Sequence, residues 1–204
     1  CELTQAANVE LLLGSGTLAN DLIGAQLSLL PGHGVVLSNG EFGGRLIDQA
    51  RRFKLRFDAI EFDWGQPFDL DAVRKQLSHV QSPAWLWCVH CETSTGVLND
   101  VETLAKLCAE HGVKLCLDCI SSVGTMPVDL EDVYLASASS GKGLRAYPGV
   151  SMVFYQHNVT PAPDRLPRYL DLGFYAQQEG IPFTFSSNLL HALHAAVRGV
   201  NWDR

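Results

Sequence analysis

The sequence predicts an α/β fold: a mostly parallel sheet flanked by helices. Short apolar runs alternate with amphipathic helical patterns from residue 11 to residue 155. One run, AWLWCV at 84–89, is apolar at every position, as expected of a strand buried on both faces of a parallel sheet. It ends abruptly in polar and hydroxyl residues. Such a strand delivers those residues to the carboxyl edge of the sheet, where ligands of α/β proteins bind.

The N-terminal half follows a repeated order of strand, turn and helix. A Gly-Ser-Gly-Thr turn at 14–17 precedes a helix that Pro31 and Gly32 end. Beyond it we expect a strand over 35–38, a helix over about 44–54, a strand near 55–61 and a helix near 69–78.

The C-terminal half continues this order before it becomes irregular. We expect strands at 84–89, 113–124, 133–137 and 149–155, with a helix over 100–111. Residues 158–186 read as an irregular segment, and 187–204 as the start of a helix. The whole chain, 1–204, reads as one domain. Because it begins without methionine and ends within a helical pattern, we expect a piece of a longer protein.

Composition argues against nucleic-acid and membrane partners. The chain has 204 residues, a formal net charge of −7 and 47% hydrophobic residues, so an anionic polymer or membrane surface would be repelled. The first residues lack the pattern of a secretory signal, and no apolar run has the length of a membrane span. We therefore expect a cytoplasmic protein.

Four of the six cysteines form two CxxC pairs, Cys88 with Cys91 and Cys116 with Cys119. This spacing suits zinc. Both pairs, however, lie in apolar segments that we interpret as strands, where residues three apart point to opposite faces. The sequence favours reduced, buried cysteines over a metal site.

Two turns offer binding groups. Ser15, Gly16 and Thr17 stand at the start of the first helix, whose exposed amides can bind a phosphate; a plain N-cap is the alternative. Phe42 lies on the turn before the second helix, between glycines. It can lie flat against a ligand ring or simply pack against the protein.

Polar residues follow the buried strands. His90, Glu92, Thr93 and Thr95 are candidates by their position after 84–89. Asp118 lies inside an apolar segment, and a buried carboxylate needs a partner. That partner is either a cationic ring nitrogen of a ligand, or nearby backbone and serine groups.

Lys142 lies among small residues in LASASSGKGLRAYPG (135–149). Its amine can approach a flat ligand closely, as a Schiff-base lysine must; an ordinary solvated lysine is the alternative. A helix N-terminus, an aromatic ring, a buried carboxylate and this amine match the phosphate, ring, ring nitrogen and aldehyde of pyridoxal phosphate.

These segments together resemble the class V aminotransferases, which are fold-type I pyridoxal-phosphate enzymes. The resemblance covers nearly the whole chain from about residue 11. It rests on GSGTLAN, NGEFGGR, HCETSTGVLN, LDCISSVGTMPVDL, SSGKGL with YPG, and YLDLGFYAQ with PFTFSS.

The resemblance implies a role for each matching residue. Lys142 is the Schiff-base lysine, Asp118 the partner of the pyridine nitrogen, and Phe42 the stacked aromatic. Ser15, Gly16 and Thr17 bind the phosphate. Thr93 contacts the phenolic oxygen, Ile120 the second ring face, and Thr184 the phosphate of the neighbouring subunit in a homodimer.

The implied activity is ping-pong transfer of an amino group from a small amino donor to a 2-oxo acid such as pyruvate or glyoxylate. HCETSTG is similar to both aminoethylphosphonate:pyruvate transaminases and alanine– or serine–glyoxylate aminotransferases.

Two departures keep alternatives open. Gly141 stands where relatives often carry a side chain before the lysine, and the C-terminal small domain that grips the substrate carboxylate has no counterpart here. The chain can therefore also be a catalytically incomplete module for cofactor binding or dimerisation. A lyase similar to cysteine desulfurases is the other alternative.

Overall fold

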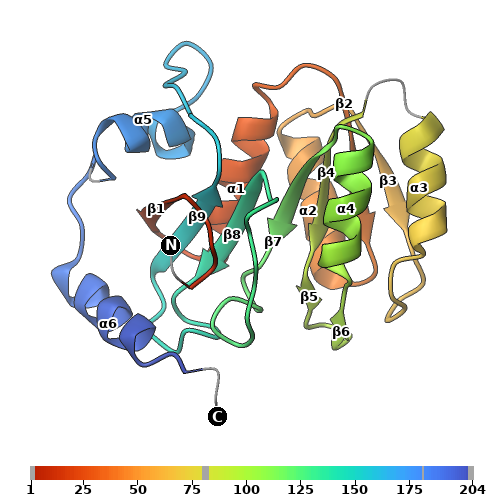
Figure 1. Ribbon diagram of the computed structural model, residues 1–204. Helices are drawn as coiled ribbons and strands as arrows, with labels where there is room; N and C mark the ends of the chain where they lie inside the picture. The colour runs from red at the N-terminus through yellow and green to blue at the C-terminus, as the bar shows by residue number, and fades with distance from the viewer. Residues whose placement is uncertain (1–2, 80–82, 181, 202–204) are drawn as a thin grey trace.

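The computed structural model describes residues 3–79, 83–180 and 182–201, and within these a seven-stranded sheet lies between helices (Figure 1). The strand order is β1-β9-β8-β7-β4-β2-β3. The strands are β1 (Asn8–Leu13), β2 (His33–Ser38), β3 (Phe57–Glu61), β4 (Pro83–Val89), β7 (Lys114–Asp118), β8 (Leu135–Ser139) and β9 (Val150–Tyr155).

The sheet is mostly parallel, which confirms the predicted fold class. β3, β2, β4, β7 and β8 all run in one direction. Only β9 is reversed relative to its two neighbours, β8 and β1. The carboxyl ends of the parallel strands therefore meet at one edge of the sheet, where the following loops can form a site.

Helices cover both faces of the sheet. α3 and α4 pack on one face together with α6, and α1 and α2 pack on the other together with α5 (Figure 1). The helices are α1 (Gly16–Leu27), α2 (Glu41–Arg52), α3 (Leu70–His79), α4 (Val101–Glu110), α5 (Leu172–Gln177) and α6 (Ser187–Arg198).

Strand β4 shows why its sequence is apolar throughout. Leu86 and Cys88 belong to the core under α3 and α4, whereas Trp85 and Trp87 belong to the core under α1 and α2. All four side chains are nearly inaccessible to solvent. A strand covered on both faces has no solvent-facing positions, so it loses the alternation of an exposed strand.

Several elements differ from the sequence prediction. α2 begins at Glu41, three residues earlier than expected, so Phe42 lies in its first turn and not before it. The strand expected over 113–124 ends at Asp118. It ends there because the chain turns at Cys119, whose carbonyl accepts hydrogen bonds from the amides of Ser122 and Val123 at 3.1 and 3.0 Å.

Other elements were not predicted. One of them is β1, which forms one edge of the sheet. A separate hairpin, β5 (Cys91–Glu92) paired with β6 (Val97–Leu98), follows β4. The segment 158–186 is not wholly irregular, because it contains a 3-10 turn, η1 (Arg168–Leu170), and then α5, capped by the Asp171 carboxylate. The helix expected from 187 is confirmed as α6, and residues 202–204 lie outside the described ranges.

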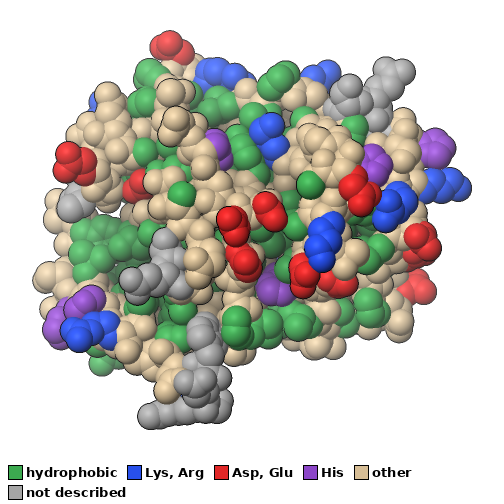
Figure 2. All heavy atoms as spheres, viewed as in Figure 1, with side chains coloured by type: hydrophobic (Ala, Val, Ile, Leu, Met, Phe, Trp, Pro, Cys, Tyr) green, Lys and Arg blue, Asp and Glu red, His purple; other side chains and the backbone are tan. Residues whose placement is uncertain are grey.

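On the face of the molecule drawn in Figure 2, basic side chains are scattered among acidic ones. Within the described ranges, no helix has both the length and the hydropathy that a bilayer crossing requires.

Gly34 and Gly44 offer a matched test of the packing in β2 and α2. A methyl group at Gly34 would overlap the buried indole of Trp85, whereas one at Gly44 would meet nothing within 4 Å. We expect Gly34→Ala to destabilise the fold by about 1–3 kcal/mol. Gly44→Ala should instead stabilise it by roughly 0.5–1 kcal/mol, through helix propensity. Urea unfolding of both variants measures the difference, and equal midpoints would contradict the packing described here.

Candidate functional site

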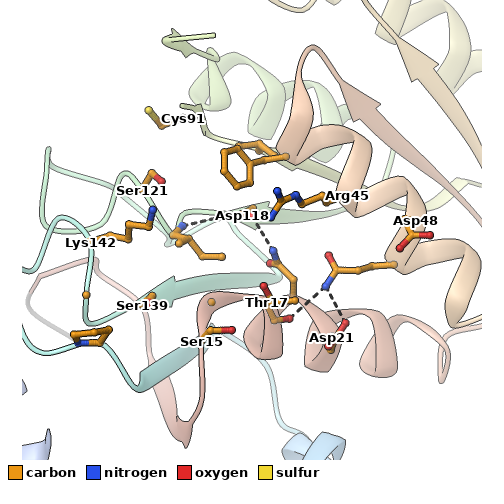
Figure 3. Close-up of a pocket in the computed structure, with 18 of the residues that line it drawn as sticks. Ser15, Thr17, Asp21, Arg45, Asp48, Cys91, Asp118, Ser121, Ser139 and Lys142 are labelled. Carbon is orange, nitrogen blue, oxygen red and sulfur yellow. Dashed lines mark hydrogen bonds between the residues drawn. The ribbon is translucent and has the colours of Figure 1, made fainter. Parts of the chain in front are cut away.

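A pocket of about 770 Å³ opens at the carboxyl edge of the parallel strands (Figure 3). Its walls come from the start of α1, one side of α2 along its length, the ends of β4 and β7, and the loop after β8. Its volume suits a small molecule or cofactor. It brings together seven of the nine residues to which the family resemblance assigns a role: Ser15, Gly16, Thr17, Phe42, Asp118, Ile120 and Lys142.

Asp118 is the last residue of β7, and its side chain is only 5% exposed. One carboxylate oxygen accepts a hydrogen bond from the Ile120 amide at 2.9 Å. The other accepts from Asn20 Nδ2 at 2.7 Å, and Asn20 Oδ1 in turn accepts from the Ser137 hydroxyl at 2.6 Å. Asp118 therefore has neutral partners from α1 and from its own turn, and the chain of hydrogen bonds extends to β8.

Sequence reasoning missed Asn20. The residue precedes Asp118 by 98 positions, so no local pattern links the two. One signal could have indicated it, since Asn20 is a polar residue on the buried face of α1, next to Ala19. The alternative with serine partners is not found, because the Ser122 hydroxyl donates to the Cys119 carbonyl at 3.3 Å. The backbone part of that alternative is correct for Ile120.

The electrostatic environment of Asp118 favours a positive ligand. Burial raises the pKa of this carboxyl and outweighs the hydrogen bonds from Asn20 and Ile120, which lower it. The charge of Glu92 raises the pKa further, and the Lys142 charge lowers it. A buried carboxylate with mostly neutral partners gains from a cation placed beside it. A protonated ring nitrogen meets this requirement.

The start of α1 leaves the amides of residues 15–17 free for an anion. Ser15 is the N-cap residue, but its side chain makes no capping hydrogen bond. The Gly14 amide before it donates to the Gly149 carbonyl at 2.9 Å, and the next amide with a partner is that of Leu18, which donates to the Ser15 carbonyl at 2.9 Å. A Cβ atom at Gly16 would lie 2.5 Å from Ile120 Cδ1, so only glycine allows Ile120 to pack over the helix start. A phosphate fits such a helix N-terminus.

Lys142 lies in the loop between β8 and β9, and its side chain points into the pocket (Figure 3). The Ser140 hydroxyl closes this loop by donating to the Tyr147 carbonyl at 2.7 Å. A Cβ atom at Gly143 would overlap the Thr125 hydroxyl. The small residues around the lysine are therefore explained by close packing of this loop against the segment that follows β7.

Gly141, just before the lysine, has no room for a side chain. A Cβ atom there would lie 2.8 Å from Pro148 Cβ and 2.9 Å from Pro148 Cα. Pro148 itself lines the pocket. The proline thus occupies space next to the lysine into which a side chain at position 141 would project.

Phe42 forms part of the pocket wall that α2 contributes. The guanidinium carbon of Arg45, one turn later in α2, lies 5.0 Å from the centre of its ring. Arg45 also forms an ion pair with Glu41 at 3.0 Å. The ring is half-buried, which leaves part of its surface accessible to a ligand.

The other candidates lie outside the pocket lining. Thr93 is exposed in the hairpin of β5 and β6, and Thr95 lies in the same turn. Thr184 is exposed beside a separate small groove that includes Leu11 and Phe183. His90 and Glu92 are buried. Cys91, which was selected only as a possible metal ligand, does line the pocket.

The CxxC pairs do not gather into one site. Cys88 and Cys116 are interior residues of β4 and β7, and Cys119 is buried in the turn after β7. Burial raises the pKa of all three thiols. Among the residues that the structure describes, no three Cys, His, Asp or Glu side chains are placed to hold a metal ion together.

Comparison with known families decides the relationship. The model of the family "Aminotransferase class-V" matches residues 4–167. The chain belongs to the class V aminotransferase family. Its resemblance in sequence motifs to this family is thereby confirmed.

Individual class V relatives match most of this chain. The 2-aminoethylphosphonate–pyruvate transaminase of Pseudomonas putida is 30% identical over 198 residues, 93% of this chain and 54% of its own length. The soluble hydrogenase 42 kDa subunit of Anabaena cylindrica is 35% identical over 181 residues, covering 83% and 47%. The alanine–glyoxylate aminotransferase of Nostoc superimposes with a TM-score of 0.82 at 32% identity, covering 96% and 55%. The chain thus spans about half the length of these relatives.

Class V aminotransferases depend on pyridoxal phosphate, and the residues of this pocket fit that cofactor. The start of α1 presents amides without acceptors for the phosphate. The hydrogen-bond partners of Asp118 are neutral, so its carboxylate can pair with a protonated ring nitrogen. Lys142 supplies an amine on the same pocket. The pocket therefore provides a group for each polar end of the cofactor.

His90 is a buried residue that is hydrogen-bonded to the backbone of Asp118. Its backbone amide donates to the Asp118 carbonyl at 2.9 Å, and its ring Nδ1 is buried without a hydrogen-bond partner. Burial lowers the pKa of this imidazole from 6.5 to about 4. The folded protein therefore holds His90 neutral over a pH range in which the unfolded chain protonates it.

We expect the stability of the fold to decrease as pH falls from about 6.5 to about 4, because the unfolded state then binds a proton that the folded state excludes. The contribution of His90 is at most about 3 kcal/mol. Denaturant unfolding of the wild type and His90→Asn at several pH values measures it. The unfolding free energy of the wild type should fall relative to that of His90→Asn as the pH approaches 4. A difference that does not change with pH would exclude this role.

Proposed function

We propose that this chain is the cofactor-binding part of a pyridoxal-phosphate-dependent aminotransferase. It would transfer an amino group from a small amino donor to a 2-oxo acid such as pyruvate or glyoxylate, by a ping-pong mechanism. The observation that carries the proposal is the placement of Lys142 and Asp118 on one pocket, with the free amides of α1 at its side. The names of the relatives support the acceptor class, since they include pyruvate and glyoxylate enzymes.

The polar groups of the pocket would hold the two ends of the cofactor. Ser15, Gly16 and Thr17 bind the phosphate through backbone amides and hydroxyls. Asp118, as the anion, accepts the hydrogen bond of the ring nitrogen and keeps its proton in place. Asn20 orients the carboxylate through the 2.7 Å hydrogen bond.

Apolar side chains would hold the plane of the ring. Phe42 stacks on one face, and Ile120 contacts the other. Both line the pocket, Phe42 from α2 and Ile120 from the turn after β7. Lys142 lines the same pocket, so its amine would be available to the aldehyde.

Lys142 would perform the proton transfers. Its amine would be the group that holds the cofactor aldehyde. The same amine would serve as the base that accepts the proton of the donor's α-carbon and as the acid that donates it again. Bound pyridoxal phosphate supplies the electron sink for this step.

Thr93 and Thr184 would complete the site from its margins. We assign Thr93 the hydrogen bond to the phenolic oxygen; its hairpin also carries Cys91, a pocket-lining residue, which supports a position near the mouth. Thr184 is exposed and away from this pocket. That position supports a contact with the phosphate of a second copy, in a homodimer.

The remaining assignments concern the whole protein. We propose that residues 1–204 form the large, cofactor-binding domain, and that the protein works in the cytoplasm. The free cysteines at 88, 91, 108, 116 and 119 suit a reducing compartment.

A second candidate is a module that binds cofactor or dimerises without turnover. It is favoured by Gly141, which offers the cofactor no side chain. The desulfurase-like alternative has less support, because the relatives described above include transaminases.

Replacing Lys142 tests the proposal directly. Lys142→Arg keeps the charge but removes the nucleophilic amine, so we expect no covalent attachment of pyridoxal phosphate and a loss of transamination of roughly 10²–10⁴-fold or more. Borohydride reduction followed by peptide mass spectrometry locates the attachment. Lys106→Arg, on the exposed surface of α4, is the control and should behave as wild type. Attachment at another lysine in the wild type would overturn the assignment.

Asp118→Asn separates binding from folding. Because burial raises the pKa of Asp118, ionising it costs folding free energy in the unliganded protein once the pH exceeds the unfolded pKa near 3.8. The unliganded variant avoids this cost, but its NH2 group faces one of the two donors, Asn20 or the Ile120 amide. The two effects oppose each other, so its stability at pH 7 should differ little from that of the wild type. Its affinity for pyridoxal phosphate should be lower, because the ring nitrogen loses its anion. Thermal melts with and without cofactor measure both effects; a large loss of stability without cofactor would contradict this account.

A further inference from the structure

Glu92 is a buried carboxylate that the mechanism does not use. Its side chain is fully inaccessible to solvent, in β5 behind the pocket. One oxygen accepts a hydrogen bond from the Gly43 amide at 2.9 Å. The other accepts from the Ser94 hydroxyl at 2.6 Å and from the Ser94 amide at 3.2 Å. Among the described residues, no lysine, arginine or histidine forms an ion pair with Glu92.

These contacts replace a cap that α2 lacks. Its N-cap residue is Gly40, which has no side chain to accept from the first-turn amides. A Cβ atom at Gly40 would lie 2.6 Å from Glu92 Cγ, so the glycine makes room for the glutamate. A carboxylate at a helix N-terminus is stabilised by the exposed amides and the helix dipole. Glu92 thus caps α2 from a different element.

A second hydrogen bond joins the same two segments. The Glu41 amide donates to the Ser94 hydroxyl oxygen at 3.0 Å. The amides of residues 41 and 43 are therefore both held by the hairpin, and the residue between them is Phe42. The backbone that carries the ring is fixed on either side.

We propose that Glu92 is a positioning residue, which fixes the ring of Phe42 against the cofactor through the first turn of α2. The inference rests on the proposed function of the pocket. Glu92 does not line the pocket, so it can reach the cofactor only through Phe42 or through its charge on Asp118. Ser94→Ala keeps that charge, so weaker binding and changed circular dichroism in this variant as well would identify the route through Phe42. The next residue in the chain is Thr93, so the same carboxylate also anchors the hairpin assigned to the phenolic oxygen.

The test compares Glu92→Gln with Glu10→Gln. Glu92→Gln keeps the shape of the side chain, but its NH2 group cannot accept a hydrogen bond. It therefore loses the bond either from the Gly43 amide or from Ser94. Glu10 is a suitable control, because it is also a buried carboxylate, 7% exposed, that accepts one hydrogen bond, from Tyr155 at 2.8 Å. It lies in β1, outside the pocket lining. A further variant, Ser94→Ala, removes the bridging hydroxyl and leaves Glu92 in place.

Two measurements on the whole chain decide the matter. Hydrogen–deuterium exchange without cofactor should show faster exchange over residues 40–46 in Glu92→Gln and Ser94→Ala, and wild-type exchange there in Glu10→Gln. With pyridoxal phosphate, Glu92→Gln should bind roughly tenfold more weakly. The circular dichroism of the bound cofactor should change as well, because this signal reports the asymmetry of the ring environment.

Each outcome bears on a separate part of the inference. Unchanged exchange over 40–46 in both Glu92→Gln and Ser94→Ala would show that the hairpin does not fix α2. Faster exchange with unchanged affinity and unchanged circular dichroism would reduce Glu92 to a structural cap. If the wild type binds no pyridoxal phosphate, the proposed function fails, and this use of Glu92 fails with it. The exchange result in the unliganded protein would still show whether Glu92 caps α2.

Discussion

The site depends on a buried carboxylate whose partners are mainly neutral. Asp118 is held at the end of β7 by Asn20 and by the Ile120 amide, and Asn20 is held in turn by Ser137. This chain of hydrogen bonds fixes α1, β7 and β8 relative to one another at one point. These bonds orient the carboxylate without neutralising its charge, so the unliganded protein bears the desolvation cost of a buried charge. A cationic ring placed beside Asp118 would offset that cost, and this would add to its binding free energy.

Close backbone approaches build the walls around that charge. Ile120 packs over the start of α1 only because position 16 is a glycine, and the lysine loop packs against Thr125 only because position 143 is a glycine. Both contacts involve segments directly after parallel strands. The turn at Ser15, the Ile120 side chain and the Lys142 loop are therefore held in a fixed relation to one another, and catalysis in general depends on such preorganised geometry.

The sequence predicted those features whose cause is local. Apolar runs and helical periodicity located the main strands and helices, and motif order located Lys142, Asp118 and the turn at Ser15. Elements without a strong pattern escaped notice. The strands β5 and β6 have two residues each, too few to show alternation. Long-range partners also escaped, because the interaction of Asn20 with Asp118 exists only once α1 has packed on the sheet.

The displaced boundary of α2 has the same kind of cause. The sequence predicts a helix over about 44–54, after a turn that carries Phe42 between glycines. The helix nevertheless begins at Glu41, because Glu92 and Ser94 from the hairpin hold its first amides. A tertiary contact here overrides local propensity, and it moves Phe42 from a turn into a helix.

The contact between Gly141 and Pro148 couples the sizes of two neighbouring positions on the pocket wall. A side chain before the lysine requires the space that Pro148 now fills. A larger residue at position 141 therefore needs a shift of Pro148 or of the backbone between the two residues. Because Pro148 lines the pocket, such a shift would alter the shape of the cavity beside Lys142.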